Sequence, residues 1–296
     1  MSDVRALVFG AGGQLGQVCM NVVPPNVSAQ GLARSECDIT DPAALKQVMG
    51  DLRPQVVINA AAYTAVDQAE EDADAARAAN ADAPALIADL CAQHQSRLVH
   101  LSTDFVFDGK GHKPYVPEAQ ASPLGVYGQT KWQGEQAVLE RGTAGVVLRT
   151  SWVYAPSGRN FVLTMLRLMR DRGEVKVVSD QIGSPTSTRG LAQICWAFAL
   201  HHDASGIFHW SDAGAVSWFD FACAIRDEAL KLGLLSRPVV VEPIGSEAFP
   251  TKAQRPAYSV LDASGTCLAL GVSQQPWRDA LRDVLRSVQH DQELSA

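Results

Sequence analysis

Tyr127 and Lys131 are the side chains of this sequence best suited to acid–base chemistry. They are four residues apart, so a helix that spans them places both on one face. A free phenol has a pKa of about 10, and a lysine ammonium one turn away favours the phenolate and lowers that value. A tyrosine tuned in this way can act as a general acid or base. Taken alone the pair is a weak signal, since any helix can carry it on its surface.

A third group, Thr103, is predicted to end a buried strand that begins with the apolar run 97–101. A loop rich in Gly, Pro and Lys follows. Ser122-Pro123 then offers an N-cap and a first-turn proline for the helix of Tyr127. Thr103 and Tyr127 can together hold a carbonyl oxygen and protonate it while a hydride attacks the carbon.

A glycine-rich turn near the N-terminus predicts a dinucleotide site. The apolar run 6–9 is typical of a buried parallel strand. Gly10, Gly13 and Gly16 follow it, and they allow a tight turn, close approach of a diphosphate and close helix packing. The next helix would point its N-terminus at the phosphates. No Gly-Lys-Ser/Thr follows, so the turn is not a P-loop.

The residues after the second predicted strand, 27–32, bear on cofactor preference. The acid that usually binds the ribose is missing there, and Arg34 follows instead. An arginine at this place can pair with a 2′-phosphate, which favours NADPH and leaves NADH as the alternative; the other interpretation is a solvated surface arginine. Asp38 and Ile39 come next, before a helix expected near Asp41-Pro42, and are placed to border the adenine.

Strands and helices alternate through the first half of the chain. A third strand over 55–59 leads into small residues at 60–64, and further strands are expected at 97–101 and 146–149. This alternation predicts an α/β fold with a Rossmann-like, doubly wound parallel sheet. We expect residues 1–150 to form the NADPH-binding domain, with some later segments returning to it, and 151–296 to form mainly a smaller α+β substrate-binding lobe.

Composition limits the class of protein. The 296 residues carry a net charge of −7 with a pI near 5.5, which argues against nucleic acid as the main partner. No apolar run approaches the roughly 20 residues of a membrane helix, and no secretory signal is evident, so we expect a cytoplasmic protein without a membrane partner. The six cysteines are scattered and form no metal-binding pattern, so no metal site is predicted from them.

Several motifs together resemble the extended short-chain dehydrogenase/reductase superfamily and, within it, the dTDP-4-dehydrorhamnose reductases. Each is short, but the combination is specific, and it spans nearly the whole chain from Gly10 to Pro256. The motifs are the glycine turn 10–16, then 59–67, 102–109, 127–131, 149–154, 180–186, and Arg255-Pro256.

This resemblance implies that NADPH reduces the C4 ketone of dTDP-4-dehydro-L-rhamnose and that dTDP-L-rhamnose is formed. By position, Tyr127 is the proton donor, and Lys131 binds the nicotinamide ribose and lowers the tyrosine pKa. The implied cofactor contacts are Gly13, Gln14 and Leu15 at the diphosphate, Asp38 and Ile39 at the adenine, and Ala62, Tyr63 and Thr64 on the nicotinamide side. The implied sugar contacts are Thr103, Asp104 and Trp152.

Some features stay open. Arg255 is a candidate for the nucleotide diphosphate, because a guanidinium matches phosphate geometry, but a surface ion pair is the alternative. The sequence departs from the family pattern at Ala11, where some relatives have a basic residue, and at Gln254, where the family has arginine. Mg²⁺ and a homodimer rest on the resemblance alone, since no acidic cluster demands the metal.

Two rival functions are weighed. A related sugar-nucleotide 4,6-dehydratase would have Asp-Glu after the threonine, whereas Phe105 follows Asp104 here; an epimerase would keep its nicotinamide tightly bound. A non-catalytic NADP-binding protein, such as the regulatory subunit of methionine adenosyltransferase, also resembles this family. The intact Thr103, Tyr127 and Lys131 set counts against that role.

Overall fold

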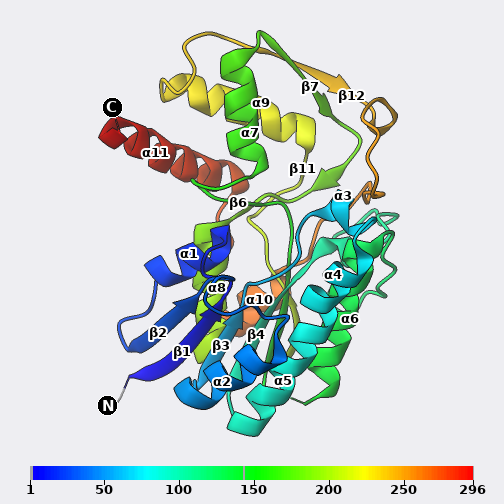
Figure 1. Ribbon diagram of the computed structural model, residues 1–296. Coiled ribbons are helices and arrows are strands. Elements are labelled where there is room, and N and C mark those ends of the chain that lie inside the picture. Colours follow the sequence, from blue (N-terminus) through cyan, green and yellow to red (C-terminus); the bar gives the residue numbers. More distant parts are fainter. Residues whose placement is uncertain (1–2, 143, 296) are drawn as a thin grey trace.

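A six-stranded parallel sheet forms the centre of the larger lobe (Figure 1). The computed structural model describes residues 3–142 and 144–295. The strands are β1 (Val4–Phe9), β2 (Val27–Leu32), β3 (Val56–Asn59), β4 (Arg97–Thr103), β5 (Gly145–Thr150) and β10 (Gly206–His209). Their order is β10-β5-β4-β3-β1-β2, so the winding reverses between β1 and β3, which is where open α/β sheets bind ligands.

The sheet is buried on both faces. Leu7, Val8 and Phe9 of β1 have no exposed surface, as expected for a central parallel strand. One face is covered by α1 (Gln14–Asn21), α8 (Thr188–Leu200) and α10 (Ser264–Leu270). The other face is covered by α2 (Pro42–Leu52), α5 (Ala83–His94) and α6 (Val126–Glu140). The predicted Rossmann-like, doubly wound fold is therefore confirmed.

The connection from β3 to β4 is longer than the others and lies beside α6. It contains α3 (Val66–Ala69), α4 (Ala73–Arg77) and a π-helical turn (Ala78–Asp82) before α5. Pro84 stands in the first turn of α5, directly after the π-helical turn. This connection therefore starts at the carboxyl end of β3 and packs against α6, the helix that carries Tyr127.

The smaller lobe mixes helices with short strand pairs. Its helices are α7 (Phe161–Asp171), α9 (Trp218–Lys231) and α11 (Trp277–Ser295). Its strand pairs are β6 (Val153–Tyr154) with β9 (Thr186–Ser187), β7 (Glu174–Val178) with β12 (Val240–Ile244), and β8 (Ile182–Gly183) with β11 (Val216–Ser217). Short 3₁₀ turns occupy Asp104–Val106 and Ser246–Ala248.

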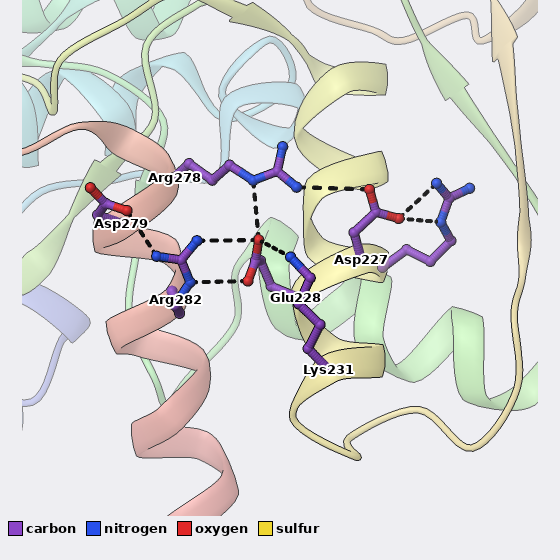
Figure 2. Close-up of polar contacts among 7 residues, drawn as sticks. Asp227, Glu228, Lys231, Arg278, Asp279 and Arg282 are labelled. Atoms are coloured by element: carbon purple, nitrogen blue, oxygen red, sulfur yellow. Dashed lines mark hydrogen bonds and ion pairs between the residues drawn. The ribbon is translucent and has the colours of Figure 1, made fainter.

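An ion cluster fastens α9 to α11. Glu228 has a side chain that is only 2% exposed, and it accepts hydrogen bonds from Lys231, Arg278 and Arg282 (Figure 2). These contacts lower its pKa to about 2, with the bond from Arg282 as the largest cause. Within residues 3–142 and 144–295, no helix is long and apolar enough to cross a membrane.

Candidate active site

The carboxyl end of β4 and the first two turns of α6 bring three predicted catalytic residues together. Thr103 ends β4, while Tyr127 and Lys131 both lie in α6. The helix begins at Val126 with Gly125 as its N-cap, so the predicted start at Ser122-Pro123 is wrong. Since Gly125 has no side chain, the N–H of Val126 donates to Oε1 of Glu70 instead, at 2.9 Å.

The first turn of α6 is pressed against the turn that follows Thr103. An added Cβ at Gly128 would collide with the carbonyl oxygen of Phe105, so only glycine allows this approach. The rings of Phe105 and Tyr127 meet edge to face, with centroids 5.5 Å apart. Thr103 Oγ1 accepts from the N–H of Phe105 at 3.2 Å and donates to Oδ1 of Asp104 at 3.0 Å.

Tyr127 has a raised pKa of about 12. Burial is the main cause, and a hydrogen bond with Thr103 opposes it. The sequence predicts a lowered pKa, whereas the net shift is upward; Lys131 is not among its causes, and the charge of Asp104 adds to the rise. The phenol is protonated at neutral pH, which is the form that a proton donor needs.

Lys131 is a buried cation with one strong partner. Its side chain is 3% exposed, and Nζ donates to the carbonyl oxygen of Leu101 at 2.6 Å. Burial lowers its pKa to about 8, opposed by the Glu135 carboxylate one turn further along α6. Glu135 in turn forms a buried bidentate pair with Arg149 of β5, at 2.9 and 2.7 Å.

Asp104 is a buried carboxylate at the same edge. Burial raises its pKa to about 6, while hydrogen bonds from Ser259 and Thr103 oppose the shift. Its Oδ2 atom has no hydrogen-bond partner in the described parts of the chain. An acceptor of this kind suits a sugar hydroxyl, because a bound donor would satisfy it.

The glycine-rich turn has the geometry that a dinucleotide needs. Gly10 has φ +79°, and an added Cβ there would come 2.7 Å from the nitrogen of Ala61. An added Cβ at Gly16 would strike the carbonyl oxygen of Gly10, so α1 packs closely on β1. Gly13 is the N-cap of α1 and cannot satisfy the first-turn N–H groups, which leaves them for an anion. The residues present therefore fit a dinucleotide cofactor.

The other predicted cofactor residues differ in how far their side chains are exposed to solvent. The side chain of Gln14 is bound by Arg159 and Asn160 of the smaller lobe, at 3.0 and 2.8 Å, and Leu15 packs against the core. Arg34 is 82% exposed and pairs with Asp38 at 3.1 Å. Ile39 is buried in the core beside α2.

Ala62, Tyr63 and Thr64 follow β3, which pairs with β4, at the carboxyl edge of the sheet. Asn80, in the π-helical turn, holds this segment: its amide bonds both the N–H and the carbonyl oxygen of Tyr63. The same amide donates to Oγ1 of Thr130, next to Lys131, at 3.2 Å. No sequence motif singles out Asn80, although a π-helical turn is often found at functional sites.

Trp152 and Arg255 are both held by local partners. Trp152, with φ +48°, stacks on Trp218 at 3.4 Å between centroids and lies against Gly183. The guanidinium of Arg255 forms a bidentate pair with Asp67 at 3.1 and 2.8 Å. Each of these two side chains is therefore already engaged by a partner within the protein.

A cavity of about 510 Å³ opens beside Arg255. It is lined by Asp180 and Gln181, by Ser246 and Glu247, and by the segment 249–255. Ala257 lines it, and Ser259, two residues on, reaches Asp104. The described residues contain no cluster of three or more His, Cys, Asp or Glu that could hold a metal ion, so nothing in them supports the Mg²⁺ expectation.

Comparison with known proteins gives matches along nearly the full chain. A family model described as RmlD substrate binding domain matches residues 4–290. A protein of Aggregatibacter actinomycetemcomitans named dTDP-4-dehydrorhamnose reductase is 38% identical over 95% of this chain and 98% of its own. One of Streptomyces antibioticus, named probable dTDP-4,6-dihydroxy-2-methyloxan-3-one 4-ketoreductase, is 40% identical over 96% of each chain.

A solved structure matches equally well. The crystal structure of dTDP-4-dehydrorhamnose reductase from Bacillus anthracis, in complex with NADP, has a TM-score of 0.91 and 34% identity to this chain. The match covers 96% of this chain and 99% of the other.

Proposed function

Because this chain belongs to the RmlD substrate binding domain family, that of the dTDP-4-dehydrorhamnose reductases, and is a nicotinamide-dependent oxidoreductase, we propose its specific reaction. It reduces the C4 ketone of dTDP-4-dehydro-L-rhamnose with NADPH and forms dTDP-L-rhamnose. The observation that carries this proposal is the meeting of Thr103, Tyr127 and Lys131 at the same carboxyl edge of the sheet as the glycine-rich turn.

NADPH, when bound, supplies the hydride, and the protein supplies orientation and the proton. Gly10, Gly13 and the N-terminus of α1 would hold its diphosphate, and the exposed guanidinium of Arg34 would pair with its 2′-phosphate. The NADP complex of the Bacillus anthracis relative supports the cofactor class.

Tyr127 is the proton donor in this proposal. The hydroxyls of Tyr127 and Thr103 bind the ketone oxygen, and negative charge grows on that oxygen as the carbon is reduced. Tyr127 then delivers its proton, so both hydroxyls act mainly in the transition state. The buried ammonium of Lys131 stabilises the phenolate that remains.

The rest of the substrate would lie along the cavity. Asp104 accepts a hydrogen bond from a sugar hydroxyl, and Trp152 closes the sugar side of the smaller lobe. Arg255 lines the cavity, but Asp67 already holds its guanidinium, so a diphosphate contact would share that charge. An unchanged KM for the nucleotide sugar in Arg255→Gln would dismiss the diphosphate role.

A second candidate is reduction of a related dTDP-linked 4-keto sugar. The Streptomyces antibioticus relative, named as a different 4-ketoreductase, is as similar to this chain as the rhamnose enzymes are. The same catalytic trio would serve both reactions, because discrimination between sugars depends on the cavity and not on the acid.

The test is NADPH oxidation by the purified protein, given dTDP-4-dehydro-L-rhamnose made in place by the upstream enzymes. Loss of NADPH absorbance together with formation of dTDP-rhamnose is expected. Turnover only with another 4-keto sugar would favour the second candidate. NADPH binding without any turnover would instead favour a non-catalytic, regulatory role. A cytoplasmic location and a homodimer stay predictions.

A further inference from the structure

The helix that carries Tyr127 and Lys131 is capped from a distant part of the chain. Gly125, its N-cap, has no side chain to accept from the first-turn N–H groups, which are otherwise unsatisfied. Glu70 accepts from the first of them, the N–H of Val126, at 2.9 Å. A carboxylate at this end also interacts favourably with the helix dipole.

The absence of a side chain at Gly125 leaves room for the Glu70 carboxylate at the start of α6. An added Cβ at Gly125 would collide with Oε1 of Glu70. Gly125 has φ −145°, an extended conformation that any residue can adopt, so the backbone itself does not demand glycine. The lack of a side chain at position 125 therefore serves the approach of the Glu70 carboxylate.

Glu70 also lies in a segment that touches the other parts of the site. Tyr63 and Thr64 precede α3, and Asp67 of α3 holds Arg255 of the cavity. Glu71, the next residue, pairs with Lys252 in the same cavity wall. The carboxylate of Glu70 thus joins α6 to the segment that meets both the predicted cofactor edge and the cavity.

We propose that Glu70 is a positioning residue for Tyr127. Its carboxylate holds Val126, while Gly128 rests on the carbonyl oxygen of Phe105. Tyr127 lies between these two fixed points, so its phenol is kept at the hydroxyl of Thr103. The inference rests on the proposed function, in which that phenol donates the proton.

The test compares Glu70→Ala, Glu70→Gln and Gly125→Ala, with Asp74→Ala as the matched loss of an exposed carboxylate from the same connection. We expect Glu70→Ala to lower kcat roughly tenfold, since small misplacements of catalytic groups are costly, and to leave the KM for NADPH unchanged. Glu70→Gln keeps an acceptor oxygen and should recover most of the rate. Gly125→Ala should reproduce the loss, because its methyl group displaces the carboxylate, and Asp74→Ala should behave like the unaltered protein.

Two readouts separate positioning from a merely structural effect. In a Tyr127→Phe background, Glu70→Ala should cause no further loss, because the residual reaction does not use the phenol. Amide hydrogen exchange of peptides covering 124–130 should rise in Glu70→Ala and not in Asp74→Ala. An unchanged kcat, an equal loss in the Tyr127→Phe background, or unchanged exchange would each overturn the proposal. A wild-type protein without turnover would overturn the proposed function alone, and exchange would still decide whether Glu70 holds the helix start.

Discussion

The ammonium of Lys131 donates a 2.6 Å hydrogen bond to the carbonyl oxygen of Leu101, two residues before Thr103 in β4. This bond joins the catalytic helix to the strand whose end carries the second hydroxyl of the site. Lys131 and Leu101 are both buried, so water screens the charge on the lysine only weakly and neighbouring groups affect it strongly.

The burial of the Lys131 ammonium predicts that kcat/KM falls at alkaline pH. Burial lowers the pKa of Lys131 to about 8, so the ammonium is charged at neutral pH and loses its proton as the pH rises through that value. We expect kcat/KM to fall above pH 8. Lys131→Met should reduce kcat about a hundredfold and abolish this fall. A fall at an unchanged pH in the variant would assign it to another group.

The buried carboxylate of Asp104 predicts that the KM for the keto sugar rises at acid pH. Because burial raises its pKa to about 6, the carboxylate is ionised above that value and takes up a proton as the pH falls through it. The protonated form accepts hydrogen bonds poorly, so we expect the KM for the keto sugar to rise below pH 6. Asp104→Asn should show a raised KM that no longer varies across this range. Steady-state kinetics at several pH values would check this, and a wild-type KM in the variant would refute it.

The buried pair of Glu135 and Arg149 predicts an asymmetric effect on stability. Glu135→Gln leaves a buried guanidinium without its counter-charge, and we expect it to lower the free energy of unfolding by about 3–5 kcal/mol. The double variant Glu135→Leu/Arg149→Met removes both charges and should recover much of that loss. Urea unfolding of the three proteins measures this, and a loss under about 1 kcal/mol in Glu135→Gln would disprove it.

Glu228 predicts part of the acid sensitivity of the smaller lobe (Figure 2). Its pKa is lowered from 4.5 to about 2 by Arg282, Lys231 and Arg278. The folded state therefore gains stability above pH 4.5 and loses it as the pH falls towards 2, by at most about 3 kcal/mol. The Glu228→Gln protein should have a lower Tm than the unaltered protein near neutrality. Its Tm should also vary less between pH 4.5 and pH 2. The exposed Glu118→Gln serves as control, and equal pH dependence in both variants would count against the cluster.

Much of the sheet follows from local sequence. The predicted strands are short, lie between turn residues and alternate with helices, and the one predicted over 27–32 coincides with β2. Thr103 at a strand end, and the pairing of Tyr127 with Lys131 on one helix, follow from spacing alone. These features depend on neighbours in sequence.

The features that could not be predicted from the sequence depend on residues far apart in the chain. The start of α6 was misplaced at Ser122 because its cap comes from Glu70, 56 residues before Val126. The pairing of Arg255 with Asp67 joins residues 188 apart. The direction of the Tyr127 pKa shift depends on burial, which no spacing rule reports. In each case tertiary packing decides the outcome.

The most direct test of the central claim compares Tyr127→Phe with the unaltered protein. The proposed mechanism predicts that kcat with NADPH and dTDP-4-dehydro-L-rhamnose falls at least about a hundredfold, since the proton donor is lost. The Kd for NADPH should stay within about threefold, because the phenylalanine retains the ring contact with Phe105. Turnover at the wild-type rate in Tyr127→Phe would contradict the assignment of Tyr127 as the acid.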